Sequence, residues 1–169
     1  DSATLRVRDL SGKVLFTRSI GRPTTIALNG ASVAWGEVID ELVPYVRLRT
    51  IRTRRTKTLG RNSLGGIGGW AYQTSAQFLG NHLYWLEPSI GEAGGFPNIA
   101  RLRLDARHPN CSWAKRNIAN KARDVVNSLA IDPPAVYYTY GDEASGIDGV
   151  HQTTLAALRF ARPDPWRCP

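Results

Sequence analysis

A chain of 169 residues has the length of one domain, and its 42% hydrophobic residues supply enough apolar material for a sizeable core, which excludes a disordered tail. The formal net charge of +8 comes from 18 arginines and 4 lysines against 14 acidic residues. Guanidinium groups pair with phosphate oxygens through two parallel hydrogen bonds, so the composition indicates a polyanionic partner. A GC-rich codon bias is an alternative source of the arginines.

No run of about 18 apolar residues occurs, so we expect no membrane-spanning helix and a protein that is not membrane-embedded. The chain starts at Asp1 and contains no methionine, which indicates a processed mature form or an excised piece. Cys111 and Cys168 could form one disulfide, remain two buried thiols, or pair between subunits, and the sequence leaves these alternatives open.

The first two strands are expected in residues 3–20. Leu5 and Val7 alternate with arginines, and the sequence "DLSGK" separates two extended runs. Because Ser11 and Gly12 favour a tight reversal, this segment predicts a β-hairpin.

A short strand and a short helix are expected next. Residues 24–30 predict the strand, which ends at Asn29-Gly30, a dipeptide that tolerates positive φ. Residues 32–45 carry apolar side chains at helical spacing after a possible Ser32 cap, and Pro44 would end this helix.

The most basic segment, "VRLRTIRTRRTKTL" (residues 46–59), contains no acidic residue. Its alternating and β-branched character predicts a strand, and since unpaired charges are costly inside an apolar core, at least one face must meet water or phosphate. A later segment, "FPNIARLRLDAR" (residues 96–107), predicts another strand that presents arginines. The two segments supply the expected nucleic-acid-binding residues: Arg47, Arg49, Arg52, Arg54, Arg55, Lys57, Arg101 and Arg103.

A glycine-rich stretch at residues 60–70 lacks the lysine and the spacing of a phosphate-binding P-loop, so we interpret it as a flexible connection. Strands are expected in residues 70–78 and 82–88. Residues 111–134 predict the clearest helix, because they end at Asp132-Pro133-Pro134 and carry an apolar stripe at helical spacing: Ile118, Ala122, Val125, Val126 and Leu129.

A strand at residues 135–140 and a possible second helix at residues 150–161 follow. No internal repeat is evident. The sequence therefore predicts a single α+β domain over residues 1–169, with a mainly antiparallel β-sheet and one main amphipathic helix packed on it.

Candidate catalytic and metal-binding groups form no specific pattern. His82, His108 and His151 could act as acid or base in phosphodiester cleavage, but lone histidines are more often structural or solvated. Ser63 does not lie in a nucleophile elbow, and the histidines and cysteines lack the ligand spacing of a zinc site. We therefore predict no catalytic residue, no metal and no cofactor.

The segment "IARLRLDARHPNCSWAKRNIANKARDVVNSL" (residues 99–129), with its strand followed by a basic helix, resembles the coat proteins of small single-stranded RNA bacteriophages. The resemblance implies a sheet that faces RNA and helices that clasp a partner subunit. It also implies that the RNA-facing candidates are Arg47, Arg49, Arg55 and Lys57.

A second set of motifs, "RSIGRP", "YQTS" and "TYGDEA", is similar in order to the catalytic subunit of pertussis-like ADP-ribosyltransferase toxins. This resemblance implies that Arg18 holds the nicotinamide cofactor and that Thr74 and Ser75 brace its pocket. Gln152 is followed by Thr154 where that family has a glutamate, so the carboxylate that stabilises the transition state is missing.

On these grounds we expect a non-enzymatic protein that binds RNA or another polyanion, self-associates and forms a viral coat. It would occur in a virion or as a secreted protein and would have no membrane partner. The alternative is a secreted toxin or effector enzyme, either an ADP-ribosyltransferase relative or a His/Arg nuclease.

Overall fold

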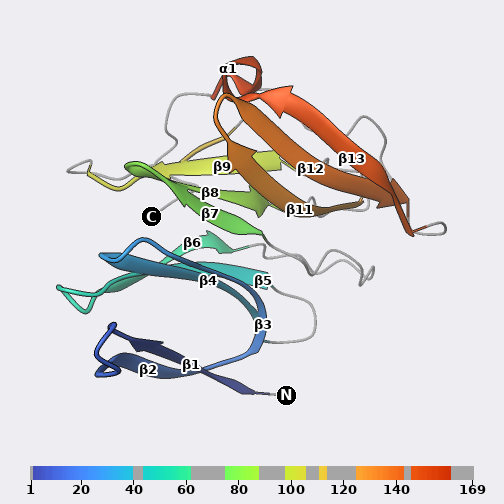
Figure 1. The fold of residues 1–169 in the computed structure, drawn as a ribbon. Helices are drawn as coiled ribbons and strands as arrows, with labels where there is room; N and C mark the ends of the chain where they lie inside the picture. The colour runs from blue at the N-terminus through green and yellow to red at the C-terminus, as the bar shows by residue number, and fades with distance from the viewer. Residues whose placement is uncertain are drawn as a thin grey trace.

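The computed structural model describes residues 2–39, 44–61, 75–87, 98–105, 111–113, 125–142 and 146–160. These residues form four antiparallel sheets that follow one another in chain order (Figure 1). The first sheet has two strands, the second and third have four, and the fourth has three. Their bounds are β1 (Ala3–Arg8) and β2 (Val14–Ile20); β3 (Arg22–Leu28), β4 (Ser32–Val38), β5 (Pro44–Thr50) and β6 (Thr56–Arg61); β7 (Ala76–Leu79), β8 (His82–Glu87), β9 (Asn98–Arg103) and β10 (Cys111–Trp113); β11 (Val125–Asp132), β12 (Ala135–Asp142) and β13 (Gly146–Thr154).

The sheets stack face to face, so the second and third sheets have buried residues on both faces (Figure 1). In β8, Leu83 and Trp85 pack against the second sheet, whereas Tyr84 and Leu86 pack against the fourth. Because side chains alternate between the two faces of a strand, burial on both sides requires a continuous apolar run rather than an alternating one.

Polar bonds join the innermost strands β3, β7 and β11, which contact one another in that order. The N–H of Ala76 in β7 donates to Thr25 Oγ1 in β3 over 3.2 Å. On its other side, the Gln77 amide donates to the Ile131 carbonyl over 2.7 Å and accepts from the Ile131 N–H over 2.8 Å. The Gln77 side chain thus replaces a strand–strand backbone pair between two sheets.

The prediction of an α+β fold with one main helix is wrong. The described residues contain no helix of seven or more residues, and α1 (Leu155–Leu158) is a single turn capped by the Thr154 hydroxyl. Within the expected helix at 111–134, the described residues form β10 and β11. Within the expected helix at 150–161, residues 150–154 are the end of strand β13, which leads directly into the single turn α1.

The helix expected at residues 32–45 is also wrong, because these residues contain β4 and the start of β5. Every residue of β4 is buried. Val33 and Trp35 pack against the first sheet, while Ala34 packs against the third. An apolar run of this kind shows no alternation with period two, so the sequence pattern predicts a helix where the structure has a strand.

The hairpin expected at residues 3–20 is confirmed as β1 and β2, with Gly12 in the left-handed region at φ +85°. The strand expected at 24–30 is β3, and the strands expected at 82–88, 96–107 and 135–140 contain β8, β9 and β12. The basic segment 46–59 is extended as predicted, but it forms two strands, β5 and β6, around a turn rather than one.

The structure shows a repeat that the sequence analysis missed. Trp35 in β4 and Trp85 in β8 are 50 residues apart, and each is followed two positions later by a glutamate. Gly30 and Gly80, five residues before each tryptophan, both have positive φ in the turn that enters the strand. Both indole rings are fully buried against the preceding sheet, so the repeat marks one inner hairpin per sheet.

We expect Gly21→Ala to lower the stability of the protein. Gly21 joins β2 to β3, and a Cβ there would lie 2.1 Å from the Val38 carbonyl oxygen, a backbone atom that cannot rotate away. Relief of such a clash costs about 1–3 kcal/mol, which thermal unfolding followed by circular dichroism would detect. Ser19→Ala, at an exposed position of β2, is the control, and equal melting temperatures for the two variants would contradict the close contact.

Candidate polyanion-binding edge

Turns from successive sheets lie along one edge of the stack (Figure 1). We call this the turn edge and define it by residues 8–13, 29–31, 51–57, 80–82 and 103–105. Backbone hydrogen bonds link neighbouring turns: the Ile51 N–H donates to the Ala31 carbonyl over 2.9 Å, and the Leu104 N–H donates to the Asn81 carbonyl over 2.8 Å. Each bond joins the two turns of one sheet, the first in the second sheet and the other in the third.

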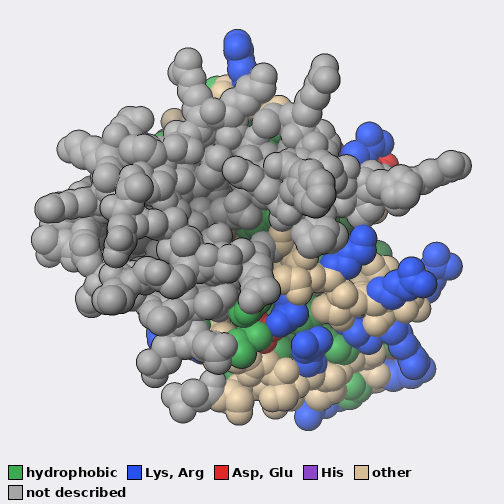
Figure 2. Space-filling model, turned by 180° about the vertical axis from the view of Figure 1, so that it is seen from behind, with side chains coloured by type: hydrophobic (Ala, Val, Ile, Leu, Met, Phe, Trp, Pro, Cys, Tyr) green, Lys and Arg blue, Asp and Glu red, His purple; other side chains and the backbone are tan. Residues whose placement is uncertain are grey.

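The basic segment contributes its turn and the start of β6 to this edge. Arg52, Arg54, Arg55 and Lys57 are all exposed, and Arg54 adopts a left-handed conformation at φ +56°. The turn is closed by the Thr50 N–H, which donates to the Arg55 carbonyl over 3.1 Å. Figure 2, which views the molecule from behind, shows Lys and Arg side chains gathered along this margin of the described surface.

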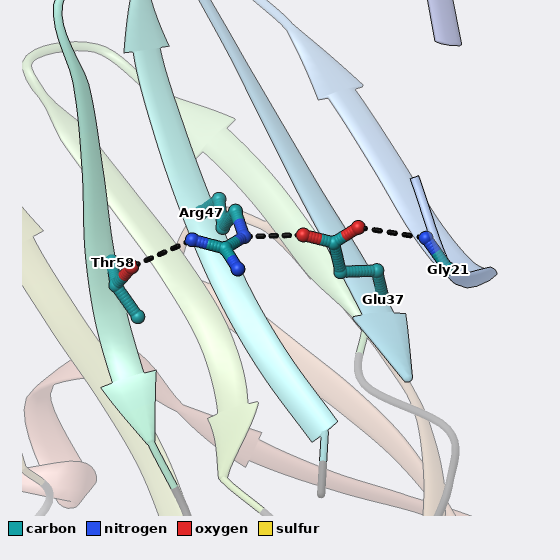
Figure 3. A network of polar contacts seen from close by, with 4 residues as sticks. All are labelled: Gly21, Glu37, Arg47 and Thr58. Carbon is teal, nitrogen blue, oxygen red and sulfur yellow. Dashed lines mark hydrogen bonds and ion pairs between the residues drawn. The ribbon is translucent and has the colours of Figure 1, made fainter. Parts of the chain in front are cut away.

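Arg47 does not reach the surface as the sequence suggests. Its guanidinium pairs with Glu37 of β4 and donates to Thr58 Oγ1 over 2.9 Å (Figure 3). The second carboxylate oxygen of Glu37 accepts the Gly21 N–H over 2.9 Å. Glu37 is 2% exposed and Arg47 16%, so the pair lies between the first and second sheets.

Arg49 is likewise placed between sheets. Its guanidinium lies over the Phe16 ring of the first sheet, 4.2 Å from the centroid, and donates to Thr56 Oγ1 over 3.0 Å. Arg18 of β2 makes a similar contact in the opposite direction, 5.8 Å from the Trp35 ring centroid. These cation–π contacts help to join the first sheet to the second, and they leave Arg49 little freedom to bind a ligand.

The tripeptide Arg-Leu-Arg occurs in both β5 and β9, but the two copies face different neighbours. Arg47 pairs across strands with Trp35, whereas Arg101 pairs with Tyr84, one position earlier than the tryptophan of its own sheet. Arg101 therefore lies on the side of the fourth sheet, 4.1 Å from the centroid of the Phe160 ring. The expected nucleic-acid-binding residues do not share one face.

Arg103 reaches the turn edge but is paired with a carboxylate. Its guanidinium donates to Asp105 through Nε over 2.6 Å and through a terminal nitrogen over 3.2 Å. The hydrogen bond from Arg103 lowers the pKa of Asp105, and the same bond raises the pKa of Arg103. Burial and then the charges of Arg101 and Arg103 lower the pKa of His82.

Cations outnumber carboxylates along the described turn edge. Two carboxylates are present, Asp9 and Asp105, and each is engaged locally. Asp9 accepts the Ser11 hydroxyl over 2.6 Å and the N–H groups of Ser11 and Lys13, and the Ser11 bond lowers the pKa of Asp9. The exposed cationic side chains of the edge are Arg8, Lys13, Arg52, Arg54, Arg55, Lys57 and Arg103.

The enzyme alternatives gain no assembled site from the described residues. Arg18 lies in the first sheet and Ser75 next to the third, with the second sheet between them. Ser75 donates its hydroxyl to the Leu129 carbonyl over 3.2 Å, a bond between sheets. His151 stacks on Tyr138, with ring centroids 5.5 Å apart. His151 lies in the fourth sheet and Arg18 in the first, so the two residues are far apart in the stack.

Several candidates lie outside the described residues: Ser63, Thr74, His108, Cys168 and the side chain of Cys111. Within the described ranges, no group of three His, Cys, Asp or Glu side chains could hold a metal ion. The same part of the chain contains no helix long and apolar enough to cross a membrane.

We expect Glu37→Leu to destabilise the protein strongly, because it leaves the Arg47 guanidinium without its carboxylate partner between two sheets. Removing one member of a buried ion pair costs about 3–5 kcal/mol. The double variant Glu37→Leu with Arg47→Met should be more stable than Glu37→Leu alone, because no unpaired charge remains. Urea unfolding of both variants measures this difference, and equal destabilisation would show that the unpaired Arg47 guanidinium has no cost of its own.

We expect Arg103→Gln to raise the pKa of Asp105 toward that of an ordinary aspartate, since the guanidinium bond is the main cause of its depression. Because the pKa of Asp105 is lowered in the folded state, the pair favours folding above the ordinary aspartate pKa and loses this effect as the pH falls through the folded-state pKa. Carboxyl-carbon NMR titration reads the pKa directly. Asp9, which Arg103 does not contact, is the internal reference and should not shift.

Comparison with known proteins finds no matching family model and no matching curated protein. Among solved structures, the chain is similar to TolB from Acinetobacter baumannii, with 16% sequence identity and a TM-score of 0.52. The match covers 92% of this chain and 36% of that chain, so this chain spans about a third of the length of TolB. The likeness shows the fold alone: successive antiparallel sheets of the β-propeller type, with the inner strands β3, β7 and β11 next to one another.

Proposed function

We propose that the turn edge binds a polyanion, with RNA as the first ligand to test. The observation that carries this proposal is the exposed group Arg52, Arg54, Arg55 and Lys57, which contains no carboxylate and stands at the end of a rigid hairpin. Arg8 and Lys13 of the first turn extend the same basic edge. Long cationic side chains on fixed turns suit contacts with phosphate oxygens, which need charge but no unique geometry.

The binding set differs from the one expected from the sequence. Arg47 and Arg49 serve contacts between sheets, and Arg103 shares its charge with Asp105. The helix that suggested a phage coat protein is replaced, in its described parts, by β10 and β11. The proposal therefore depends on the charge and exposure of the turn edge, and self-association remains a prediction to be read in the same experiment.

We expect Arg52→Gln with Arg55→Gln to weaken binding to a fluorescein-labelled single-stranded RNA and to flatten its salt dependence. Each lost phosphate contact reduces the slope of log K against log salt by about 0.7 for a single strand. Fluorescence anisotropy over a salt series measures both effects. Heparin as a competitor shows whether the edge recognises polyanions in general.

The matched control is Arg6→Gln with Arg22→Gln, which removes the same charge from exposed positions in β1 and at the start of β3. If binding depended on net charge alone, the two double variants would weaken it equally, and the turn edge would have no special role. Size-exclusion chromatography of the free and RNA-bound protein reports self-association separately.

A further inference from the structure

Three aromatic side chains meet where the third sheet reaches the turn edge. His82 and Tyr84 of β8 have ring centroids 5.9 Å apart, and the Phe160 ring lies edge-on to Tyr84 at 5.8 Å. Tyr84 is 5% exposed, whereas His82 and Phe160 are partly exposed. Two rings that water can reach are therefore positioned by a buried one.

Phe160 reaches this place because the fourth sheet turns at the same end of the stack. Ser75 and Gln77 bond to β11 in the same chain order, so β7 and β11 run in the same direction. The turn that follows each strand therefore lies at the same end. The Leu155 N–H donates to the Pro134 carbonyl over 3.0 Å, which holds α1, and Phe160 shortly after it, at that end (Figure 1).

Two arginines of β9 lie on the same face as these rings. Arg103 pairs across strands with His82, and Arg101 pairs with Tyr84. The Arg101 guanidinium lies over the Phe160 ring, 4.1 Å from its centroid, and this cation–π contact orients the guanidinium. Positive charge and partly exposed aromatic surface therefore occur together at this point of the turn edge.

The polar atoms of the His82 ring are not used by the fold. Among the residues that the structure describes, none forms a hydrogen bond with either ring nitrogen. The nearby carboxylate of Asp105 is held by the Arg103 guanidinium and by the Asn81 amide, the latter over 3.3 Å. An approaching phosphate thus meets a carboxylate that already has partners.

Aromatic rings beside arginines match the two parts of a nucleotide. A base has a π face that stacks on an aromatic ring, whereas its phosphate pairs with a guanidinium group. A duplex hides the faces of its bases, and a sulfated polysaccharide has none. The combination therefore suits a single strand with unpaired bases.

We propose that His82, Phe160 and Arg101 form a stacking site for an unpaired base of a single-stranded nucleic acid that lies along the turn edge. The inference rests on the proposed polyanion binding and narrows it to a polymer with accessible bases. The cations of the edge contact phosphates, and one base turns inward and stacks on the partly exposed rings.

The test compares a ten-residue uridine oligonucleotide with an abasic oligonucleotide of the same length and charge, each labelled with fluorescein. Anisotropy titrations use the whole chain. We expect the uridine chain to bind at least about fivefold more tightly, because stacking of one base adds to the phosphate contacts that both chains share. In NMR spectra, the ring protons of His82 should shift with the uridine chain and not with the abasic chain.

We expect His82→Ala with Phe160→Leu to weaken binding of the uridine chain to the level of the abasic chain, whose own affinity should not change. His151→Ala is the matched control, because His151 is another exposed histidine that stacks on a tyrosine, and it should leave the preference intact. Arg52→Gln with Arg55→Gln should weaken both ligands and keep their ratio. If the first double variant does not fold, His82→Ala alone replaces it, with the same expected direction.

The outcomes separate the stacking site from the polyanion-binding edge. Equal binding of the two ligands by the unchanged protein overturns the stacking site and leaves the edge in place. If neither ligand binds, both are overturned. The stacking site is also overturned if His151→Ala removes the preference, or if His82→Ala with Phe160→Leu weakens both ligands equally, since the bases then make no separate contribution.

Discussion

Burial of both faces of a sheet is the constraint on which this structure depends. A charged side chain in the middle of the second or third sheet has no route to water, so it must be neutralised where it lies. Glu37 and Arg47 satisfy this condition together, and their remaining polar atoms bond to the Gly21 N–H and the Thr58 hydroxyl. The network joins β4, β5 and β6 to the connection between the first and second sheets (Figure 3). Arg49, also between the first and second sheets, has the Phe16 ring and the Thr56 hydroxyl as partners instead of a carboxylate, whereas Arg52, Arg54, Arg55 and Lys57 are exposed on the turn edge.

The same constraint decides which elements the sequence could predict. β1 has one buried and one exposed face, so Leu5 and Val7 alternate with Arg6 and Arg8, and its hairpin was recognised. β4 is buried throughout and shows no alternation, so its apolar residues matched a helix equally well. β11 contains Val125, Val126 and Leu129 of the predicted helical stripe, and its pairing register with β12 shifts between Val126 and Leu129. Tertiary burial, which sequence periodicity does not report, therefore caused the main error in fold class.

The candidate site was predictable in position but not in detail. The basic segment does carry the exposed cluster, because a turn rich in arginine and threonine has no apolar surface to bury. The directions in which the Arg47 and Arg101 side chains point were not predictable, since both residues begin the same Arg-Leu-Arg tripeptide. A difference of one residue in pairing register turns the first toward Glu37 and the second toward Phe160. The repeat of Gly30 and Trp35 as Gly80 and Trp85 could have predicted this difference. It aligns β4 with β8, and in that alignment the two Arg-Leu-Arg tripeptides do not occupy corresponding positions.

For the proposed polyanion binding, the arrangement of the turns suits a polymeric ligand better than a small anion. Stacked sheets lie about 10 Å apart, whereas electrostatic interactions are screened over about 8 Å at physiological ionic strength. Arg8 and Lys13 belong to the turn of the first sheet, and Arg52, Arg54 and Arg55 to a turn of the second, so they form two clusters of cations, one on each sheet. A single phosphate meets one cluster and gains little, because exposed ion pairs contribute at most about 1 kcal/mol each. A chain with regularly repeated charges contacts several clusters at once, and each contact after the first is intramolecular. In the proposed function, such an edge would select for length and charge density rather than for one chemical group.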